Sequence, residues 1–157
     1  MKFLVIGSEG SMGKRRIRCL TKLGYNDIFG YDIKNYKNYK NSEYYKIENL
    51  LKIQNFDAMI ISTPPDKHSE YISLAAQKYI PCFIEAGVLD EGYNIYSYWS
   101  KANRTIIPSA TMLFHPAIKL IKKTIYEDYS LGVLSNAMYY LGQYLPSWHP
   151  GQDMKDY

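Results

Sequence analysis

The chain has 157 residues, of which 46% are hydrophobic and 22% are charged, and its formal net charge is +4. These values are typical of an ordinary globular protein and exclude a disordered chain. The longest apolar runs, such as residues 3–6 and 58–61, are far shorter than the roughly 20 residues that cross a bilayer, so we expect a cytoplasmic protein and no membrane partner.

Short apolar runs alternate with amphipathic segments over most of the chain. Residues 3–6 predict a strand that is buried on both faces, and residues 11–23 predict a helix that Gly24 ends in a left-handed conformation. The same reasoning predicts strands at 28–32, 44–47, 57–62, 81–85 and 105–111, a loop at 35–42, and helices at 48–54, 66–78, 90–103 and 116–126, with Asp66 as a helix cap. This alternation is typical of βαβ units, so we expect an α/β fold of the Rossmann type with a doubly wound parallel sheet.

The pattern changes after residue 126. Residues 132–145 alternate as one long strand candidate, unlike the segments before them. We therefore expect a dinucleotide-binding Rossmann domain over residues 1–126 and the start of a second domain over residues 127–157.

The two cysteines and the one basic cluster carry little functional information. Cys19 falls in a predicted helix and Cys82 in a predicted buried strand, so we expect two buried free thiols, with a disulfide as the alternative. Neither has metal-binding partners nearby, and we expect no metal site. The basic run 14–18 comes without a nucleic-acid-reading motif, so we interpret it as a solvated helix face, with cofactor phosphates as the second interpretation and no nucleic-acid partner.

A glycine-rich turn joins the first predicted strand to the first predicted helix. Glycines there allow a tight turn, close approach of the backbone to a pyrophosphate, and packing of the helix on the strand, and the helix start offers N–H groups to the phosphates. The spacing G-x-x-G-x-x-G is one residue longer than usual, and a turn that binds another ligand or none is the alternative. The candidate cofactor-binding residues of the turn are Gly7, Ser8, Gly10, Ser11, Met12 and Gly13.

Asp32 ends the second predicted strand, roughly 20 residues past the turn. A carboxylate at that place accepts hydrogen bonds from the ribose hydroxyls and repels a 2′-phosphate, so it favours NAD over NADP as the cofactor. Lys34 follows closely and weakens the repulsion, which keeps NADP as the second choice. The alternative interpretation of Asp32 is a solvated loop aspartate.

Several further segments carry a family resemblance. Residues 56–68 read FDAMIISTPPDKH, residues 83–85 read FIE, and residues 112–117 read MLFHPA. Residues 142–150 read GQYLPSWHP, with Asp153 and Tyr157 after them. Together with the glycine turn, these segments resemble the Gfo/Idh/MocA oxidoreductases, the superfamily of glucose–fructose oxidoreductase and inositol dehydrogenase, and the resemblance covers essentially the whole chain.

The resemblance implies further cofactor-binding residues. Thr63, Pro64 and His68 would border the nicotinamide half of the cofactor, and Glu85 would lie near the nicotinamide ribose. Such positions, at the carboxyl ends of parallel strands, line the crevice where dinucleotides bind. For His68 the alternative is a surface histidine at a helix start, and for His115 we favour a structural role between domains over a chemical one.

The sequence departs from the family at the positions where the family's catalytic residues would lie. The family's Glu-Lys-Pro motif corresponds here to residues 85–87, Glu-Ala-Gly, so its lysine is replaced by Ala86. The family's later Asp and His would fall beyond Tyr157, so we expect only the start of an α+β substrate and oligomerisation domain. Hydride transfer from an alcohol needs a positioned base. The catalytic residues are therefore unknown, and we expect this chain alone to be inactive.

The resemblance implies an NAD-dependent oxidoreductase of a sugar or nucleotide sugar in surface polysaccharide synthesis, seen as a truncated chain. The expected partners are the dinucleotide and, if the second domain is completed, the sugar substrate. A non-catalytic NAD-binding protein with a regulatory or scaffold role is the alternative, which the missing lysine favours. Because the strand candidate 132–145 would lack covering neighbours, we also expect self-association, as in a homo-oligomer.

Overall fold

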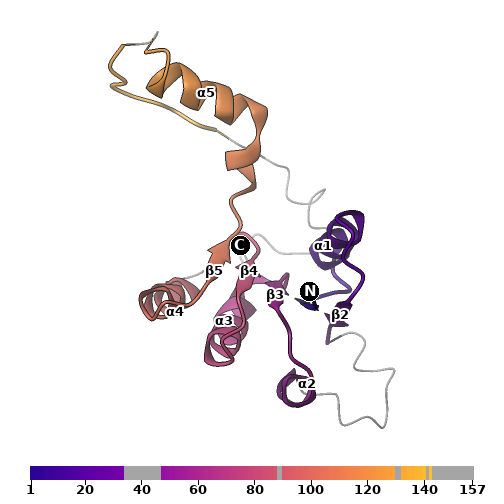
Figure 1. Ribbon diagram of the computed structural model, residues 1–157. Helices are drawn as coiled ribbons and strands as arrows, with labels where there is room; N and C mark the ends of the chain where they lie inside the picture. Colours follow the sequence, from indigo (N-terminus) through magenta and orange to yellow (C-terminus); the bar gives the residue numbers. More distant parts are fainter. Residues whose placement is uncertain (34–46, 88–89, 130–131, 141, 143–157) are drawn as a thin grey trace. The chain divides into compact units, whose positions relative to one another are not determined.

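The computed structural model describes residues 1–33, 47–87, 90–129, 132–140 and 142 (Figure 1). The chain forms two compact units, Met1–Ala110 and Thr111–Tyr157, and each is described by itself. The domain boundary expected at residue 126 remains a prediction.

The first unit contains a five-stranded sheet in the order β2-β1-β3-β4-β5, in which every neighbouring pair is parallel. The strands are β1 (Phe3–Ile6), β2 (Ile28–Tyr31), β3 (Ala58–Ile61), β4 (Cys82–Ile84) and β5 (Ile106–Pro108). Phe3 pairs with Ile28 on one side and with Ala58 on the other, so β1 is a central strand. The strand order reverses at β1, which confirms the predicted Rossmann-type doubly wound α/β fold.

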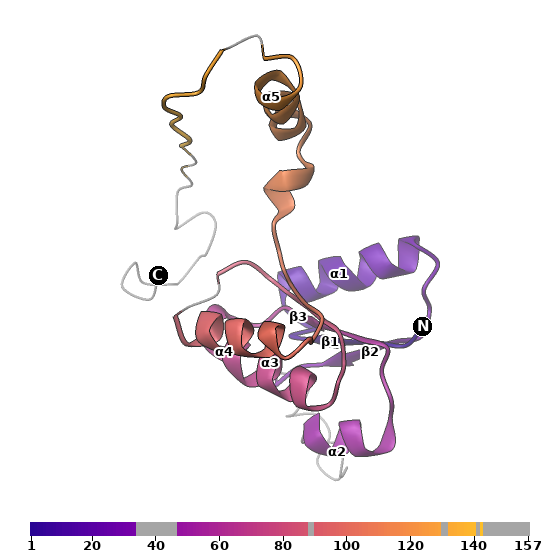
Figure 2. The ribbon, with the colours of Figure 1, turned by 60° about the vertical axis from the view of Figure 1, so that its left-hand side comes forward.

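Helices cover the two faces of the sheet unequally. Figure 2 shows α1 (Ser11–Lys22) on one face and α2 (Ile47–Ile53), α3 (His68–Gln77) and α4 (Asp90–Lys101) on the other. A short 3₁₀ helix, η3 (Pro65–Lys67), leads into α3. The second unit contains the 3₁₀ helix η4 (Thr111–Phe114) and α5 (Pro116–Tyr126).

The larger core lies on the face covered by three helices. Its buried side chains come from β1, β3, β4, β5, α2 and α3, and partly buried residues of β2 and α4 pack against them. Leu4, Ile72, Ala75 and Ile84 are fully buried in it. The core on the α1 face is smaller and consists of Phe3, Val5, Leu20 and Ile60. Alternate residues of each strand point to opposite faces, so one apolar run in the sequence supplies both cores.

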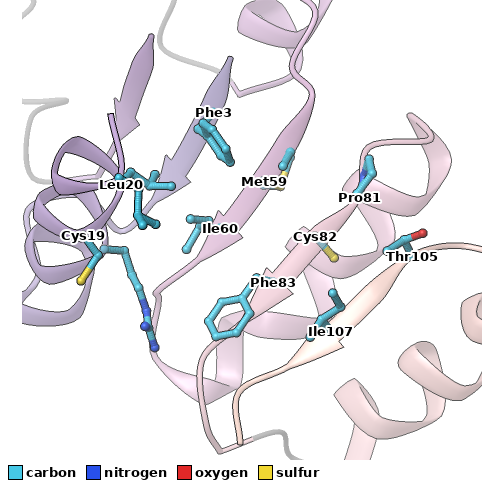
Figure 3. Close-up of a pocket in the computed structure, with 13 residues that line it drawn as sticks. Phe3, Cys19, Leu20, Met59, Ile60, Pro81, Cys82, Phe83, Thr105 and Ile107 are labelled. Atoms are coloured by element: carbon cyan, nitrogen blue, oxygen red, sulfur yellow. The ribbon is translucent and has the colours of Figure 1, made fainter. Parts of the chain in front are cut away.

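A groove remains on the α1 face, beside the smaller core (Figure 3). Its volume is about 320 Å³, and its walls are α1 and the strands β3, β4 and β5. Phe83 and Ile107 point into it, and Ile107 is 54% exposed. Among the described residues that line the groove, Arg16 is the charged one. None of the eleven candidate cofactor-binding residues is among that described lining.

Most predicted elements are confirmed within one to three residues, and Gly24 ends α1 with φ +89° as expected. Asp66 was expected to cap a helix, but it lies inside η3 and makes an exposed ion pair with Lys67 at 3.3 Å. The prolines of the Thr-Pro-Pro turn start this 3₁₀ segment early, so α3 begins only at His68. A short strand was expected at residues 44–47, but Ile47 is the first residue of α2. The other positions of that strand, the expected loop 35–42 and Lys34 lie outside the described residues.

The structure also differs from the predictions for the cysteines and for the strand at residues 132–145. Both cysteines are free, but Cys19 of α1 is exposed at the rim of the groove, whereas burial of Cys82 raises the pKa of its thiol to about 12. Residues 132–140 and 142 of the expected strand 132–145 form no strand, because nothing described pairs with their backbone, and residues 141 and 143–145 lie outside the described part. In the described ranges, no helix has both the length and the apolar character needed to span a membrane.

Candidate functional site

The glycine turn is a tight connection that tolerates side chains at neither end. Gly7 has φ +76°, and a Cβ there would lie 2.6 Å from the carbonyl oxygen of Ser62, which follows β3. A Cβ on Gly13 would lie 2.8 Å from the carbonyl carbon of Gly7, because α1 begins directly against the turn. Gly10 has an ordinary extended conformation, and its Cβ would lie 3.3 Å from the Gly7 oxygen. The left-handed position is therefore Gly7, and Gly13 is the place of closest packing.

The first turn of α1 has no acidic residue of its own and no side-chain cap for its backbone amides. Gly10 is the N-cap and has no side chain to accept their hydrogen bonds, and the first turn contains no acidic residue. Ser11 is exposed and Met12 is half-buried at this helix start. Free N–H groups and the positive end of the helix dipole favour an anionic group such as a phosphate.

Asp32 and Ser8 connect the turn to β2. Asp32 Oδ2 accepts a hydrogen bond of 2.9 Å from the N–H of Glu9, and the N–H of Ser8 donates to the carbonyl of Tyr31 at 3.2 Å. The Ser8 side chain packs against Gly30, where a Cβ would lie 2.8 Å from its hydroxyl oxygen. Asp32 is half-buried, so the interpretation as a fully solvated loop aspartate does not hold.

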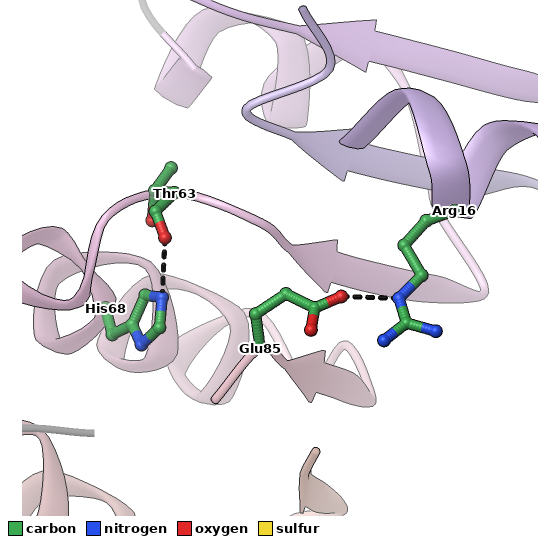
Figure 4. A network of polar contacts seen from close by, with 4 residues as sticks. All are labelled: Arg16, Thr63, His68 and Glu85. Carbon is green, nitrogen blue, oxygen red and sulfur yellow. Dashed lines mark hydrogen bonds and ion pairs between the residues drawn. The ribbon is translucent and has the colours of Figure 1, made fainter. Parts of the chain in front are cut away.

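His68 lies under the turn that follows β3 and is fully buried (Figure 4). Its Nε2 is 2.8 Å from the carbonyl oxygen of Thr63. A carbonyl oxygen only accepts, so Nε2 carries the proton and Nδ1 has the lone pair. Burial lowers the pKa of His68, and the hydrogen bond to Thr63 opposes that shift only in part, so the ring is neutral at neutral pH. His68 is thus neither on the surface nor in the open crevice.

Glu85 follows β4 and forms an ion pair with Arg16 of α1 (Figure 4). The two side chains are only 10% and 19% exposed, and the Arg16 guanidinium lies over the Phe83 ring, 4.8 Å from its centre. The hydrogen bond to Glu85 raises the pKa of Arg16, so the guanidinium stays charged. Sequence reasoning assigned Arg16 to a solvated face, although its place three residues after Gly13 turns it toward the sheet.

Buried polar atoms without partners concentrate at this end of the sheet. In the part of the chain that the structure describes, the buried side-chain atoms without a hydrogen bond are those of Ser8, Arg16, Ser62, Thr63 and His68. They are Oγ of both serines, Oγ1 of Thr63, Nη2 of Arg16 and Nδ1 of His68. Native proteins leave few such atoms unsatisfied, so a ligand or water at this place is expected to pair with some of them.

The structure therefore brings the candidate residues to one edge. Gly7 and Asp32 follow β1 and β2, Thr63 and Pro64 follow β3, and Glu85 follows β4. Carboxyl ends of neighbouring parallel strands, at the point where the strand order reverses, form the ligand crevice of open α/β sheets. Pro64 is exposed beside this edge.

Ala86 and Gly87 directly follow Glu85 in the chain. Ala86 is exposed, and Gly87 has φ +92° with Pro65 so close that a Cβ would lie 2.8 Å from its side chain. His115, in the second unit, caps α5 through Nδ1, which accepts a 3.2 Å hydrogen bond from the N–H of Ala117. The described residues contain no group of three His, Cys, Asp or Glu side chains arranged for a metal ion.

No protein-family model matches the sequence, and no curated protein sequence matches it. Solved structures resemble it in fold. The WlbA dehydrogenase from Bordetella pertussis, in complex with NADH and UDP-GlcNAcA, has a TM-score of 0.65 and 17% identity over 84% of this chain and 42% of its own. A UDP-N-acetylglucosamine 3-dehydrogenase from Acidithiobacillus ferrooxidans has a TM-score of 0.62 and 18% identity over 80% of this chain and 42% of its own. A putative myo-inositol dehydrogenase from Sinorhizobium meliloti has a TM-score of 0.62 and 19% identity, with shares of 84% and 42%.

All three neighbours are named as dehydrogenases, and one of them was solved with NADH. Their likeness confirms the Rossmann-type fold that the sequence predicts. At identities below one fifth, the likeness concerns the fold alone. The chain spans 42% of the length of each of these three structures.

Proposed function

We propose that the first unit binds a nicotinamide dinucleotide at the carboxyl ends of β1 to β4 and belongs to an oxidoreductase. The observation that carries the proposal is the coincidence of two features at one edge of the sheet. One is a glycine turn whose ends have no room for side chains, followed by an uncapped helix start. The other is the set of buried polar atoms without partners in the described chain. Such a cradle fits a pyrophosphate, with donors and acceptors left for the rest of the ligand.

Each residue of the site has a definite part in this binding mode. The amides of residues 11–13 hold the pyrophosphate, and Asp32 accepts from the adenosine ribose while it also fixes the turn through Glu9. Thr63 and Pro64 border the nicotinamide half, and Glu85, held by Arg16, lies toward the nicotinamide ribose. His68 supports the site from beneath by fixing the Thr63 carbonyl. When bound, the cofactor supplies the hydride chemistry.

The substrate class of the proposal is a sugar or nucleotide sugar, in the synthesis of surface polysaccharide. The nucleotide-sugar part is supported by two neighbours, a UDP-N-acetylglucosamine 3-dehydrogenase and a dehydrogenase crystallised with UDP-GlcNAcA. Production of NADH from a panel of sugars and nucleotide sugars tests this part separately from cofactor binding. Because this chain alone is expected to be inactive, the panel is also run on a version in which the second domain is completed. Absence of turnover in that version, with NAD bound, would favour the second candidate.

That second candidate is a non-catalytic NAD-binding protein with a regulatory or scaffold role. One observation favours it, because the exposed position next to Glu85 is Ala86 and offers no side-chain cation to a substrate. The site proposed for the dinucleotide is the same in both cases. The two candidates differ only in turnover.

The cofactor proposal predicts a preference for NAD(H) over NADP(H), because the Asp32 carboxylate repels a 2′-phosphate. The variant Asp32→Ala loses that repulsion and ribose hydrogen bonds, so the preference should narrow by about 1–3 kcal/mol. Calorimetric titration of the full chain with both cofactors measures this difference. Equal affinity for the two cofactors in the unmodified protein contradicts the assignment of Asp32.

A further inference from the structure

Two carboxylate-bearing residues meet where the glycine turn passes the end of β2. The Glu9 N–H donates to Asp32 Oδ2 at 2.9 Å, although the two residues are 23 positions apart in the chain. This bond holds the backbone of Glu9 against the Asp32 carboxylate, and both residues are half-buried. The Glu9 side chain therefore starts directly beside the group that is proposed to contact the adenosine ribose.

Glu9 also forms an ion pair with Lys14, the first basic residue of α1. Its Oε2 lies 3.2 Å from Lys14 Nζ, and the two side chains are 35% and 55% exposed. An ion pair as exposed as this one adds little to stability. Its consequence is electrostatic, because the Lys14 charge is paired with Glu9 at the place where a ligand phosphate would otherwise attract it.

We propose that Glu9 is a selectivity-determining residue that, with Asp32, excludes a phosphate from the 2′ position of the adenosine ribose. The inference rests on the proposed function, since it requires a dinucleotide on the glycine turn. A 2′-phosphate adds about −1.5 to −2 charges at neutral pH, as other phosphate monoesters do. At this edge it meets the carboxylates of Asp32 and Glu9, while Glu9 keeps Lys14 from compensating. NAD carries only hydroxyl groups there and avoids the repulsion.

The test is the ratio of NADP⁺ to NAD⁺ affinity in the full chain and in Glu9→Gln, measured by calorimetry at low salt. Glutamine keeps the size of the side chain and the backbone N–H that Asp32 binds, and removes only the charge. We expect NADP⁺ to bind roughly tenfold more tightly in this variant and NAD⁺ to change less than twofold. The gain should shrink at high salt, because the Glu9 and Lys14 side chains are 35% and 55% exposed and mobile ions screen exposed charges.

Two further variants separate the local effect from a change in net charge. Asp27→Asn removes one negative charge at the opposite, amino end of β2, where Asp27 is exposed, and should leave the affinity ratio unchanged. The double variant Glu9→Gln with Lys14→Gln lacks the released cation, so its gain in NADP⁺ affinity should be smaller than that of Glu9→Gln alone.

The outcomes distinguish the inference from the proposed function. If the unmodified chain binds no NAD⁺, the proposed function fails and the inference fails with it. If NAD⁺ binds but Glu9→Gln leaves the affinity ratio within twofold of the original, the proposed function stands and the role of Glu9 is refuted. An equal shift in Asp27→Asn also refutes it, because the effect would then come from net charge.

Discussion

At the ends of β1 and β2 the site is formed mainly by the backbone of the glycine turn, with Asp32 as its carboxylate, whereas at the ends of β3 and β4 it is formed by buried side chains. The first half depends on Gly7 and Gly13, whose missing side chains let the turn, β3 and the start of α1 approach one another. The second half depends on His68, held by the Thr63 carbonyl, and on the ion pair between Glu85 and Arg16.

Different changes should therefore disrupt the two halves of the site. A backbone cradle is lost when a side chain is added at Gly7 or Gly13, and its glycines and backbone amides do not titrate. A set of buried polar side chains is lost when one partner is removed or changes its protonation. Substitutions and pH can thus be used to separate them.

The largest effect is expected from Gly13→Val, in the backbone half. Its Cβ would lie 2.8 Å from the Gly7 carbonyl carbon and from the Ser8 Cα, so the turn must move away from the helix. We expect loss of dinucleotide binding and a decrease of about 3 kcal/mol in the free energy of unfolding, as for other overpacked positions. Denaturant unfolding and NAD⁺ titration measure the two effects.

Gly24→Ala is the matched control for this prediction. Gly24 also has a special conformation, with φ +89°, but nothing lies within 4 Å of its added Cβ. It should lose stability through backbone strain alone, by about 1 kcal/mol, and keep its NAD⁺ affinity. Unchanged binding in Gly13→Val would show that the cofactor does not lie on this turn.

The next effect is expected from Glu85→Gln, in the side-chain half. The variant leaves the buried Arg16 charge without its counter-ion, so we expect a loss of about 2–3 kcal/mol in unfolding free energy, less than for fully buried pairs because both groups keep some exposure. Adding Arg16→Met to this variant should restore most of that stability, since no unpaired charge then remains. A double variant as unstable as Glu85→Gln would contradict this explanation.

The smallest effect is a dependence of stability on pH that comes from His68. Burial lowers the pKa of His68 in the folded chain below 6.5, its ordinary value in the unfolded chain. At a pH between the folded and the unfolded pKa, the unfolded chain therefore binds a proton that the folded chain does not bind. The free energy of unfolding should therefore be constant above pH 6.5 and should fall as the pH falls below it, by at most about 1.4 kcal/mol per pH unit.

His68→Gln should remove this pH dependence while it keeps a side-chain N–H for the Thr63 carbonyl. His115→Gln is the matched control, because His115 is exposed and should leave the slope in place. Urea unfolding at several pH values between 5 and 8 gives the slopes, and an identical slope in His68→Gln would refute the assignment.

The backbone half of the site could be predicted from the sequence more fully than the side-chain half. The backbone half follows from local rules, because glycine spacing after an apolar run specifies a turn whichever residues lie across from it. Asp32 was placed by its distance along the chain, which β2 fixes. What the sequence did not contain was the contact of Gly7 with Ser62, because that contact depends on β3 pairing beside β1.

The side-chain half was only partly predictable. Thr63, His68 and Glu85 came from a family resemblance, but the burial of His68 depends on the 3₁₀ turn that delays α3. Arg16 was missed because three neighbouring basic residues on α1 suggested a solvated face, and its partner, Glu85, lies 69 positions away, just after β4. Long-range pairing of this kind leaves no pattern in a single sequence.

The central claim is that the carboxyl edge of the sheet, and not the apolar groove on the α1 face, holds the dinucleotide. Backbone amide resonances of the full chain, followed during titration with NAD⁺, test it directly. The account predicts saturable shifts that are largest at residues 7–13, at Asp32 and at Glu85. Shifts confined to residues that line the groove, such as Leu23 and Ile107, or no saturable shift at all, would contradict it.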